Sequence, residues 1–206
     1  MENKNSKYIN IKAILLGESG VGKTNLINVV SGLGFDENSS ATYINSYIEK
    51  VFIINNNKYL LQLWDTIGQE KYRTLTKIFF KDTKIVIFVY DKSSKKSYEE
   101  LKYWTDEVSK ILGDDIVKAV IGNKADLDEE EGDVDENKAR NFAKNLNAKF
   151  RMTSAKENSK GFIHLLNELI DDYLNKNNGN INENKNTISL DAENHKKTQK
   201  NQNGCC

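Results

Sequence analysis

Proline is absent from the 206 residues of the chain, and only two cysteines occur, Cys205 and Cys206. Because these cysteines are adjacent at the very end, they cannot join distant parts of a fold by a disulfide. No apolar run reaches the roughly eighteen residues of a membrane-spanning helix, and the amino terminus lacks the charged and then apolar pattern of a secretory signal. These absences favour a cytosolic protein whose terminal cysteines need another explanation.

An excess of one charge is also lacking, because 30 basic side chains balance 30 acidic ones. The overall charge therefore does not indicate nucleic acid or a strongly anionic membrane as a partner. Acidic side chains gather in residues 126–136. We interpret this run as a solvated surface loop, and a regulatory or metal-binding role is the alternative.

The length allows one well-packed domain with a tail. After residue 174 the composition turns to asparagine, lysine and other polar residues, which cannot support a core. We therefore expect one domain over residues 1–175 and a disordered tail over residues 176–206.

Apolar and helical patterns alternate through the first part of the chain. Apolar runs predict strands at residues 8–16, 46–54, 58–64, 85–90 and 117–122, and periodic patterns predict helices at 22–31, 97–112, 135–147 and 161–174. Three asparagines at 55–57 predict an antiparallel hairpin. The order predicts a three-layer α/β domain, with helices on both faces of the sheet and a nucleotide at the carboxyl ends of its strands.

The octapeptide GESGVGKT at residues 17–24 lies between the first predicted strand and the first predicted helix. Its glycines let the backbone curl so that several N–H groups face one anion. Lys23 adds a cation for the β- and γ-phosphates, Thr24 supplies a hydroxyl to Mg²⁺, and the helix directs its positive dipole end at the phosphates. The motif predicts nucleotide binding, and the alternative is a glycine turn before an ordinary helix.

A second motif, WDTIGQE at residues 64–70, follows the third predicted strand. Asp65 ends that strand, Gly68 permits a backbone N–H to approach a γ-phosphate, and Gln69 carries an amide able to orient a water for in-line attack. Taken alone, Gln69 is an exposed polar loop residue. Its closeness to Asp65 and Gly68 favours a hydrolytic site without a strong base.

The tetrapeptide NKAD at residues 123–126 is the segment that can select the base of the nucleotide. Asp126 can accept hydrogen bonds from N1 and N2 of guanine, which adenine cannot donate in that pattern. With these motifs in this order, residues 8–174 resemble the small GTPases of the Ras superfamily. The resemblance implies a P-loop GTPase domain with a mostly parallel, six-stranded sheet that contains one antiparallel strand, and it implies GTP, GDP and Mg²⁺ as ligands.

The resemblance also implies roles for single residues. In that family Asn123 ties loops together beside the base, Lys124 packs along the base, and an aromatic at the position of Phe35 stacks on it. A second base loop reads SAK, here residues 154–156, in which the N–H of Ala155 meets the guanine carbonyl. The implied nucleotide-binding set is Ser19, Gly20, Val21, Gly22, Lys23, Thr24, Asn25, Phe35, Thr42, Gly68, Asn123, Lys124, Asp126, Ser154, Ala155 and Lys156.

The magnesium site and the catalytic group follow from the same resemblance. The family's magnesium-binding threonine lies nineteen residues beyond the loop lysine, which is Thr42 in this chain. Thr24 and Thr42 are the implied direct ligands in the GTP state, and Asp65 supports the metal through water. The implied catalytic residues are Gln69, Lys23 and Gly68.

Within the superfamily, residues 61–66 and 69–76 look most like the Rab proteins, the vesicle-traffic branch. Tyr47, Trp64 and Phe79 match the aromatic triad that Rab effectors contact, and packing between switch and sheet is the alternative for these side chains. The ending, with Cys205 and Cys206, looks like the Rab double-cysteine ending that carries two geranylgeranyl groups. Two such chains give stable membrane attachment where one is marginal.

The resemblance implies a monomer on the cytosolic face of an endomembrane or of the plasma membrane, and no nucleic acid partner. It implies an exchange factor, a GTPase-activating protein, a GDP-dissociation inhibitor or escort protein, and effectors. No arginine occupies an obvious finger position, so we expect fast hydrolysis to need one from the activating protein.

Two departures from the family pattern leave alternatives open. Ile67 replaces the usual alanine beside the γ-phosphate, and residues 42–47 lack the usual first-switch sequence. One alternative is therefore a GTP-holding scaffold that hydrolyses little. A metabolic P-loop kinase or ATPase is the other, and Asp126 argues against it.

Overall fold

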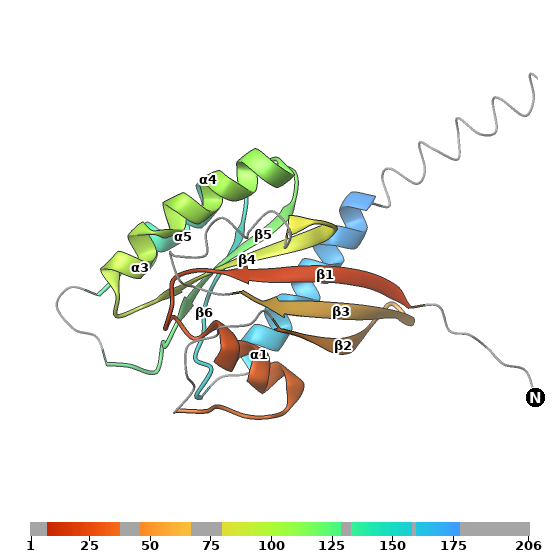
Figure 1. The fold of residues 1–206 in the computed structure, drawn as a ribbon, viewed down its shortest axis with the longest axis horizontal. Coiled ribbons are helices and arrows are strands. Elements are labelled where there is room, and N and C mark those ends of the chain that lie inside the picture. Colours follow the sequence, from red (N-terminus) through yellow and green to blue (C-terminus); the bar gives the residue numbers. More distant parts are fainter. Residues whose placement is uncertain (1–7, 38–45, 67–79, 129–132, 158–159, 178–206) are drawn as a thin grey trace, which may run out of the picture. The chain divides into compact units, whose positions relative to one another are not determined.

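The structure is a computed structural model that describes residues 8–37, 46–66, 80–128, 133–157 and 160–177. The chain divides after Ile170 into two units. The first unit contains β1 (Ile9–Leu16), α1 (Lys23–Ser31), β2 (Ser46–Ile54), β3 (Asn57–Asp65), β4 (Thr83–Asp91), α3 (Lys95–Glu99), α4 (Leu101–Leu112), β5 (Val117–Asn123), α5 (Glu136–Asn145) and β6 (Lys149–Met152) (Figure 1).

The six strands form one sheet in the order β2-β3-β1-β4-β5-β6. β2 pairs antiparallel with β3, and the other neighbouring strands pair in parallel. Asn55 and Asn56 have φ angles of 48° and 62°, and Ile54 pairs with Asn57, so two residues with positive φ close the hairpin. The sheet confirms the predicted α/β fold, including its one antiparallel strand.

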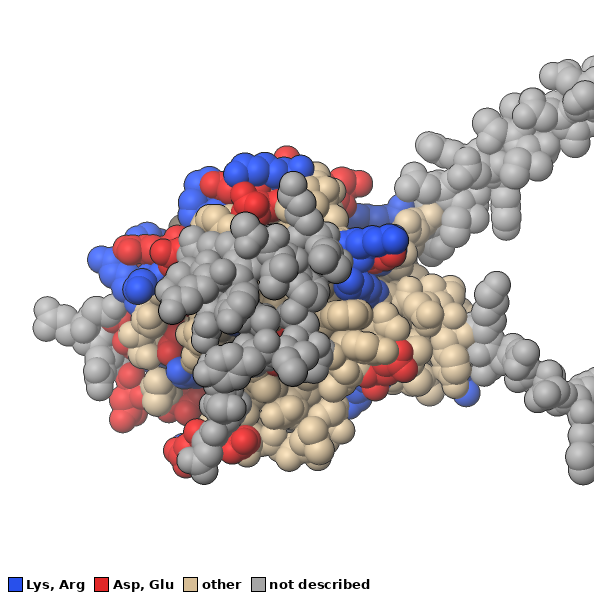
Figure 2. All heavy atoms as spheres, viewed as in Figure 1, with Lys and Arg blue, Asp and Glu red and all other residues tan. Residues whose placement is uncertain are grey.

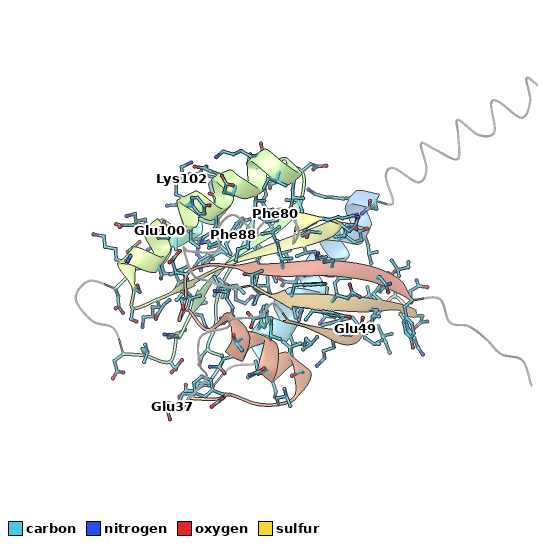
Figure 3. All side chains as sticks on the ribbon, in the orientation of Figure 1. Glu37, Glu49, Phe80, Phe88, Glu100 and Lys102 are labelled. Carbon is cyan, nitrogen blue, oxygen red and sulfur yellow. The ribbon has the colours of Figure 1, made fainter. Side chains whose placement is uncertain are left out.

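Helices cover both faces of the sheet. On one face, alternate residues of β1, β4 and β5 pack against α3, α4 and α5 in a core that includes Phe80, Phe88 and Trp104. Figure 3 shows Phe80 and Phe88 between the strands and α4. On the other face α1 contacts β2 and β3 and buries Leu26 and Val30. The three predicted layers are therefore present.

Several helix boundaries differ from the sequence-based expectation. The helix expected at 97–112 begins at Lys95, with the Ser94 hydroxyl accepting from the N–H of Ser97, and Glu100 divides it into α3 and α4. The helix expected at 161–174 runs over 160–177, so residues 176 and 177, which we assigned to the tail, are helical.

No helix among the described residues has the length and apolar character to cross a membrane.

The sixth strand, β6, was not located from the sequence. Its four residues are lysine, phenylalanine, arginine and methionine, and all four are partly exposed. A strand this short at the edge of a sheet gives little periodic signal. Its parallel pairing with β5 is what identifies it.

Candidate functional site

The phosphate loop, residues 17–24, joins β1 to α1 at the carboxyl edge of the sheet (Figure 1). Two of its glycines are required by close contacts. A Cβ on Gly17 would lie 2.1 Å from the carbonyl oxygen of Val89, and a Cβ on Gly22 would lie 2.3 Å from the side-chain nitrogen of Asn123. Gly22 also has a φ of 94°, which side chains disfavour. The loop therefore packs tightly against the ends of β4 and β5.

Lys23 folds back into this loop. Its Nζ donates hydrogen bonds to the carbonyl oxygens of Gly17, at 2.7 Å, and Glu18, at 2.8 Å. Burial lowers the pKa of the Lys23 ammonium to about 8, although the nearby carboxylates of Asp65 and Glu18 raise it in part. An anion at the loop would favour the charged ammonium, which fits the phosphate contact predicted for this lysine.

Thr24 and Asp65 come together from two different elements, the start of α1 and the end of β3. The Thr24 hydroxyl donates to Oδ2 of Asp65 at 2.7 Å, and Asp65 is 1% exposed. The hydroxyl of Thr66 donates to the carbonyl of Leu15, which holds the end of β3 beside β1. A hydroxyl and a carboxylate are hard oxygen donors of the kind that Mg²⁺ prefers, so these two residues fit the predicted metal.

Asn123 links three segments at the end of β5. Its Nδ2 donates to the carbonyl of Val21 at 2.9 Å. Its Oδ1 accepts from the Thr153 hydroxyl and from the N–H of Ala155, both at 3.3 Å. One buried amide thus joins the phosphate loop to residues 153–155, as the family resemblance implied.

A cavity of about 280 Å³ opens beside this amide. Nine of its eleven lining residues belong to the predicted nucleotide-binding set. Sequence reasoning missed Glu37 and Leu127, which belong to none of the motifs. The lining residues are Gly20, Gly22, Asn25, Phe35, Glu37, Asn123, Lys124, Asp126, Leu127, Ala155 and Lys156.

Among the other predicted binding residues, Ser154 is buried next to the cavity-lining Ala155. The Ser154 hydroxyl accepts from the N–H groups of Lys156 and Glu157, at 3.1 and 2.9 Å, and so shapes the second base loop. Val21 is also buried, and its carbonyl is the group that Asn123 holds. Ser19 lies exposed in the phosphate loop.

Asp91 is a further residue that sequence reasoning missed. It ends β4, pairs with Asn123 in the register of the sheet, and receives Lys124 in an ion pair of 2.6 Å between Oδ2 and Nζ. Lys124 has a φ of 63°, which is rare for a lysine. The place of Asp91 at the carboxyl end of a parallel strand is the signal from which the sequence analysis could have found it.

The predicted effector aromatics are partly described. Tyr47 and Trp64 stack with ring centroids 4.7 Å apart, and the Lys12 ammonium lies 4.4 Å from the Trp64 centroid. Tyr47 is 48% exposed. Figure 2 shows mostly uncharged surface on its right-hand side, over the β2–β3 turn, which is the opposite end of this hairpin from Tyr47 and Trp64.

Several predicted residues lie outside the described part of the chain. These are Thr42, Ile67, Gly68, Gln69, Phe79, Cys205 and Cys206. Their roles remain predictions. The described residues therefore include the glycine-rich loop, Thr24 and Asp65 of the predicted metal ligands, and most of the residues predicted to contact the base.

The amino-acid sequence is similar to a known protein family and to individual proteins of that family. The sequence model of the Ras family matches residues 12–174. Ras-related protein Rab-21 of Geodia cydonium is 37% identical over 161 residues, which are 78% of this chain and 69% of that protein. Rab-21 of Mus musculus is 37% identical over 158 residues, 77% of this chain and 70% of that protein. Ras-related protein Rab-26 of Drosophila melanogaster is 35% identical over 149 residues, 72% and 38% of the two chains.

Proposed function

Because the chain belongs to the Rab family of Ras-superfamily small GTPases, we propose that it binds GTP and GDP beside Asn123, hydrolyses GTP, and recruits effectors in vesicle traffic. Membership of this family removes the alternative of a metabolic P-loop kinase. The observation that carries the proposal is the Asn123 amide, which holds the phosphate loop and the second base loop around one cavity.

Different residues bind the base and the phosphates of the nucleotide. Asp126 accepts hydrogen bonds from the guanine N1 and N2 groups, while Lys124 and Phe35 cover the base. The N–H groups of the phosphate loop and the ammonium of Lys23 hold the phosphates. Since burial lowers the pKa of Lys23, a bound phosphate would favour the charged ammonium that burial disfavours.

Magnesium fits the oxygen donors at the end of β3. Thr24 would hold the ion directly, Asp65 through water, and Thr42 in the GTP state. When bound, the ion would neutralise negative charge on the β- and γ-phosphates. The hydrogen bond between Thr24 and Asp65 keeps both oxygens at this position.

Gln69 orients the attacking water, and the Gly68 N–H donates to the γ-phosphate. Because the site lacks a strong base, hydrolysis is slow until an activating protein supplies an arginine, an effect of about 10³ to 10⁵ in rate. Ile67 adds a branched side chain next to these groups. This substitution is the observation that favours the second candidate, a GTP-holding scaffold with little turnover.

GTP orders the two switch segments and hydrolysis releases them, so effectors bind one state only. The exposed ring of Tyr47 and the partly buried ring of Trp64 on which it stacks form the effector surface together with Phe79. An exchange factor, an activating protein and a GDP-dissociation inhibitor or escort protein regulate the cycle. Prenyl groups on Cys205 and Cys206 anchor the protein to the cytosolic face of a membrane.

The test is single-turnover GTP hydrolysis by the full chain, compared with Gln69→Leu and Ile67→Ala variants. The enzyme proposal expects slow hydrolysis that is lost in Gln69→Leu and little changed in Ile67→Ala. Hydrolysis no faster than that of Gln69→Leu, together with recovery in Ile67→Ala, would establish the scaffold instead. A chain that fails to bind GTP or GDP contradicts both.

A further inference from the structure

The chain reverses direction where α1 ends. Gly32 and Gly34 have φ angles of 89° and 82°, and the N–H groups of Gly32 and Leu33 donate to the carbonyls of Val29, at 3.4 Å, and Asn28, at 3.0 Å. Left-handed residues that close the last carbonyls of a helix are a common helix ending. Figure 1 shows the segment that follows α1 running back below the helix toward its beginning. This reversal brings Asp36 beside the first turn of α1.

Asn25 meets Asp36 there through both of its side-chain polar atoms. The Asn25 Nδ2 donates to the carbonyl of Asp36 at 2.9 Å, and the N–H of Asp36 donates to the Asn25 Oδ1 at 3.0 Å. An amide that bonds both backbone groups of one residue fixes its position and its orientation, as pairing between strands does. The side chain of Asn25 is therefore engaged by the protein itself.

The two neighbours of Asp36 line the nucleotide cavity. Phe35 and Glu37 both belong to its wall, and Figure 3 shows Glu37 on the segment that returns below α1. Burial contributes little to holding this part of the cavity wall, residues 35–37, in place. Leu33 is 78% exposed and Phe35 is 40% exposed. The hydrogen bonds of Asn25 are thus well placed to decide how often the wall opens.

We propose that Asn25 is a latch, a positioning residue whose amide holds Phe35 over the bound base and so slows nucleotide release. The latch rests on the proposed function, since it acts on the guanine nucleotide that the cavity takes. It differs from the contact with nucleotide that the sequence implied for Asn25, because its side chain works through Asp36. Release then requires the two hydrogen bonds between the Asn25 amide and Asp36 to break before Phe35 moves away.

The experiment measures the release of GDP carrying a fluorescent group from the full chain, chased with excess unlabelled GDP. Asn25→Ala should release the nucleotide about three to ten times faster, since two solvent-exposed hydrogen bonds are lost. Asn167→Ala is the matched control. It also removes an amide that donates to a backbone carbonyl, that of Ile163 at 3.0 Å, but it does not line the cavity. Its release rate should equal that of the unmodified chain.

A second variant pair separates a latch from a general structural effect. In a Phe35→Ala chain the wall no longer covers the base, so adding Asn25→Ala should change the release rate less than about twofold. An undiminished effect of Asn25→Ala in that chain overturns the latch, as does a release rate for Asn25→Ala alone that equals the unmodified rate. If the unmodified chain binds no guanine nucleotide, the proposed function fails and the latch fails with it.

Discussion

The side-chain amide of Asn123 occupies the space that a Cβ on Gly22 would need, with 2.3 Å between the two positions. Residues 101 positions apart in the sequence are thus matched in size, because the small residue lets the amide reach the carbonyl of Val21. The phosphate loop and the base loops are joined only if Gly22 stays small.

Gly22→Ala should therefore destabilise the protein beyond the ordinary cost of a positive φ. Gly32→Ala is the control, because Gly32 has a similar φ of 89° and a Cβ at this residue would meet nothing within 4 Å. We expect the free energy of unfolding to fall by about 2 kcal/mol more for Gly22→Ala, since the Asn123 hydrogen bonds must break or shift. Urea unfolding of both variants tests this, and equal losses would show that the amide has room to move.

The ion pair between Asp91 and Lys124 should position the lysine over the base. Asp91→Asn removes the charge that holds Nζ at 2.6 Å, and a partly exposed pair of this kind is worth about 1 kcal/mol or less. GDP should consequently dissociate up to about five times faster. Asp133→Asn, which breaks the neighbouring ion pair with Lys92, should leave the rate unchanged. Identical rates for the two variants would remove Asp91 from the site.

Asp126→Asn should reduce the preference for guanine. The carboxylate accepts from the N1 and N2 groups, and loss of hydrogen bonds to a charged acceptor costs about 1.5–3 kcal/mol, or about 10- to 100-fold in affinity for GDP. Inosine diphosphate lacks the N2 amino group, so its affinity should fall less. Titration of GDP and of inosine diphosphate into the unmodified chain and into Asp126→Asn measures the ratio of the two affinities. A preference for GDP that survives in Asp126→Asn would place guanine recognition elsewhere.

The buried ammonium of Lys23 should make the stability of the nucleotide-free chain depend on pH. Its pKa is lowered from 10.5 to about 8 in the folded state, so between these values the unfolded chain binds more protons than the folded one. The free energy of unfolding should therefore rise as the pH increases from about 8 to about 10.5, by up to roughly 3 kcal/mol from this group.

Lys23→Met isolates this contribution, because every other titrating group is kept. Urea unfolding at pH 7 and pH 10 should show a smaller rise for the variant than for the unmodified chain. Equal pH dependence in the two chains would mean that the ammonium is hydrated in the nucleotide-free loop.

Local motifs were enough to predict most of the fold. The strands, the hairpin at Asn55 and Asn56, and the loop at residues 17–24 follow from periodicity and turn chemistry, which act between near neighbours. The sequence did not locate β6, because its pairing with β5 is what makes these residues a strand. Asp91 and Glu37 escaped because neither belongs to a motif, and their roles arise from which segments lie side by side.

The amino-acid sequence by itself determined the type of domain and predicted the class of ligand, since the GESGVGKT and NKAD motifs are recognisable from residue types at fixed spacing. Only the tertiary structure decided how these parts are joined. The contacts of Asn123 with Val21, of Asp91 with Lys124 and of Asn25 with Asp36 span 102, 33 and 11 positions of the chain. Contacts over such separations depend on the packing of the sheet and of the segment after α1, which no local pattern encodes.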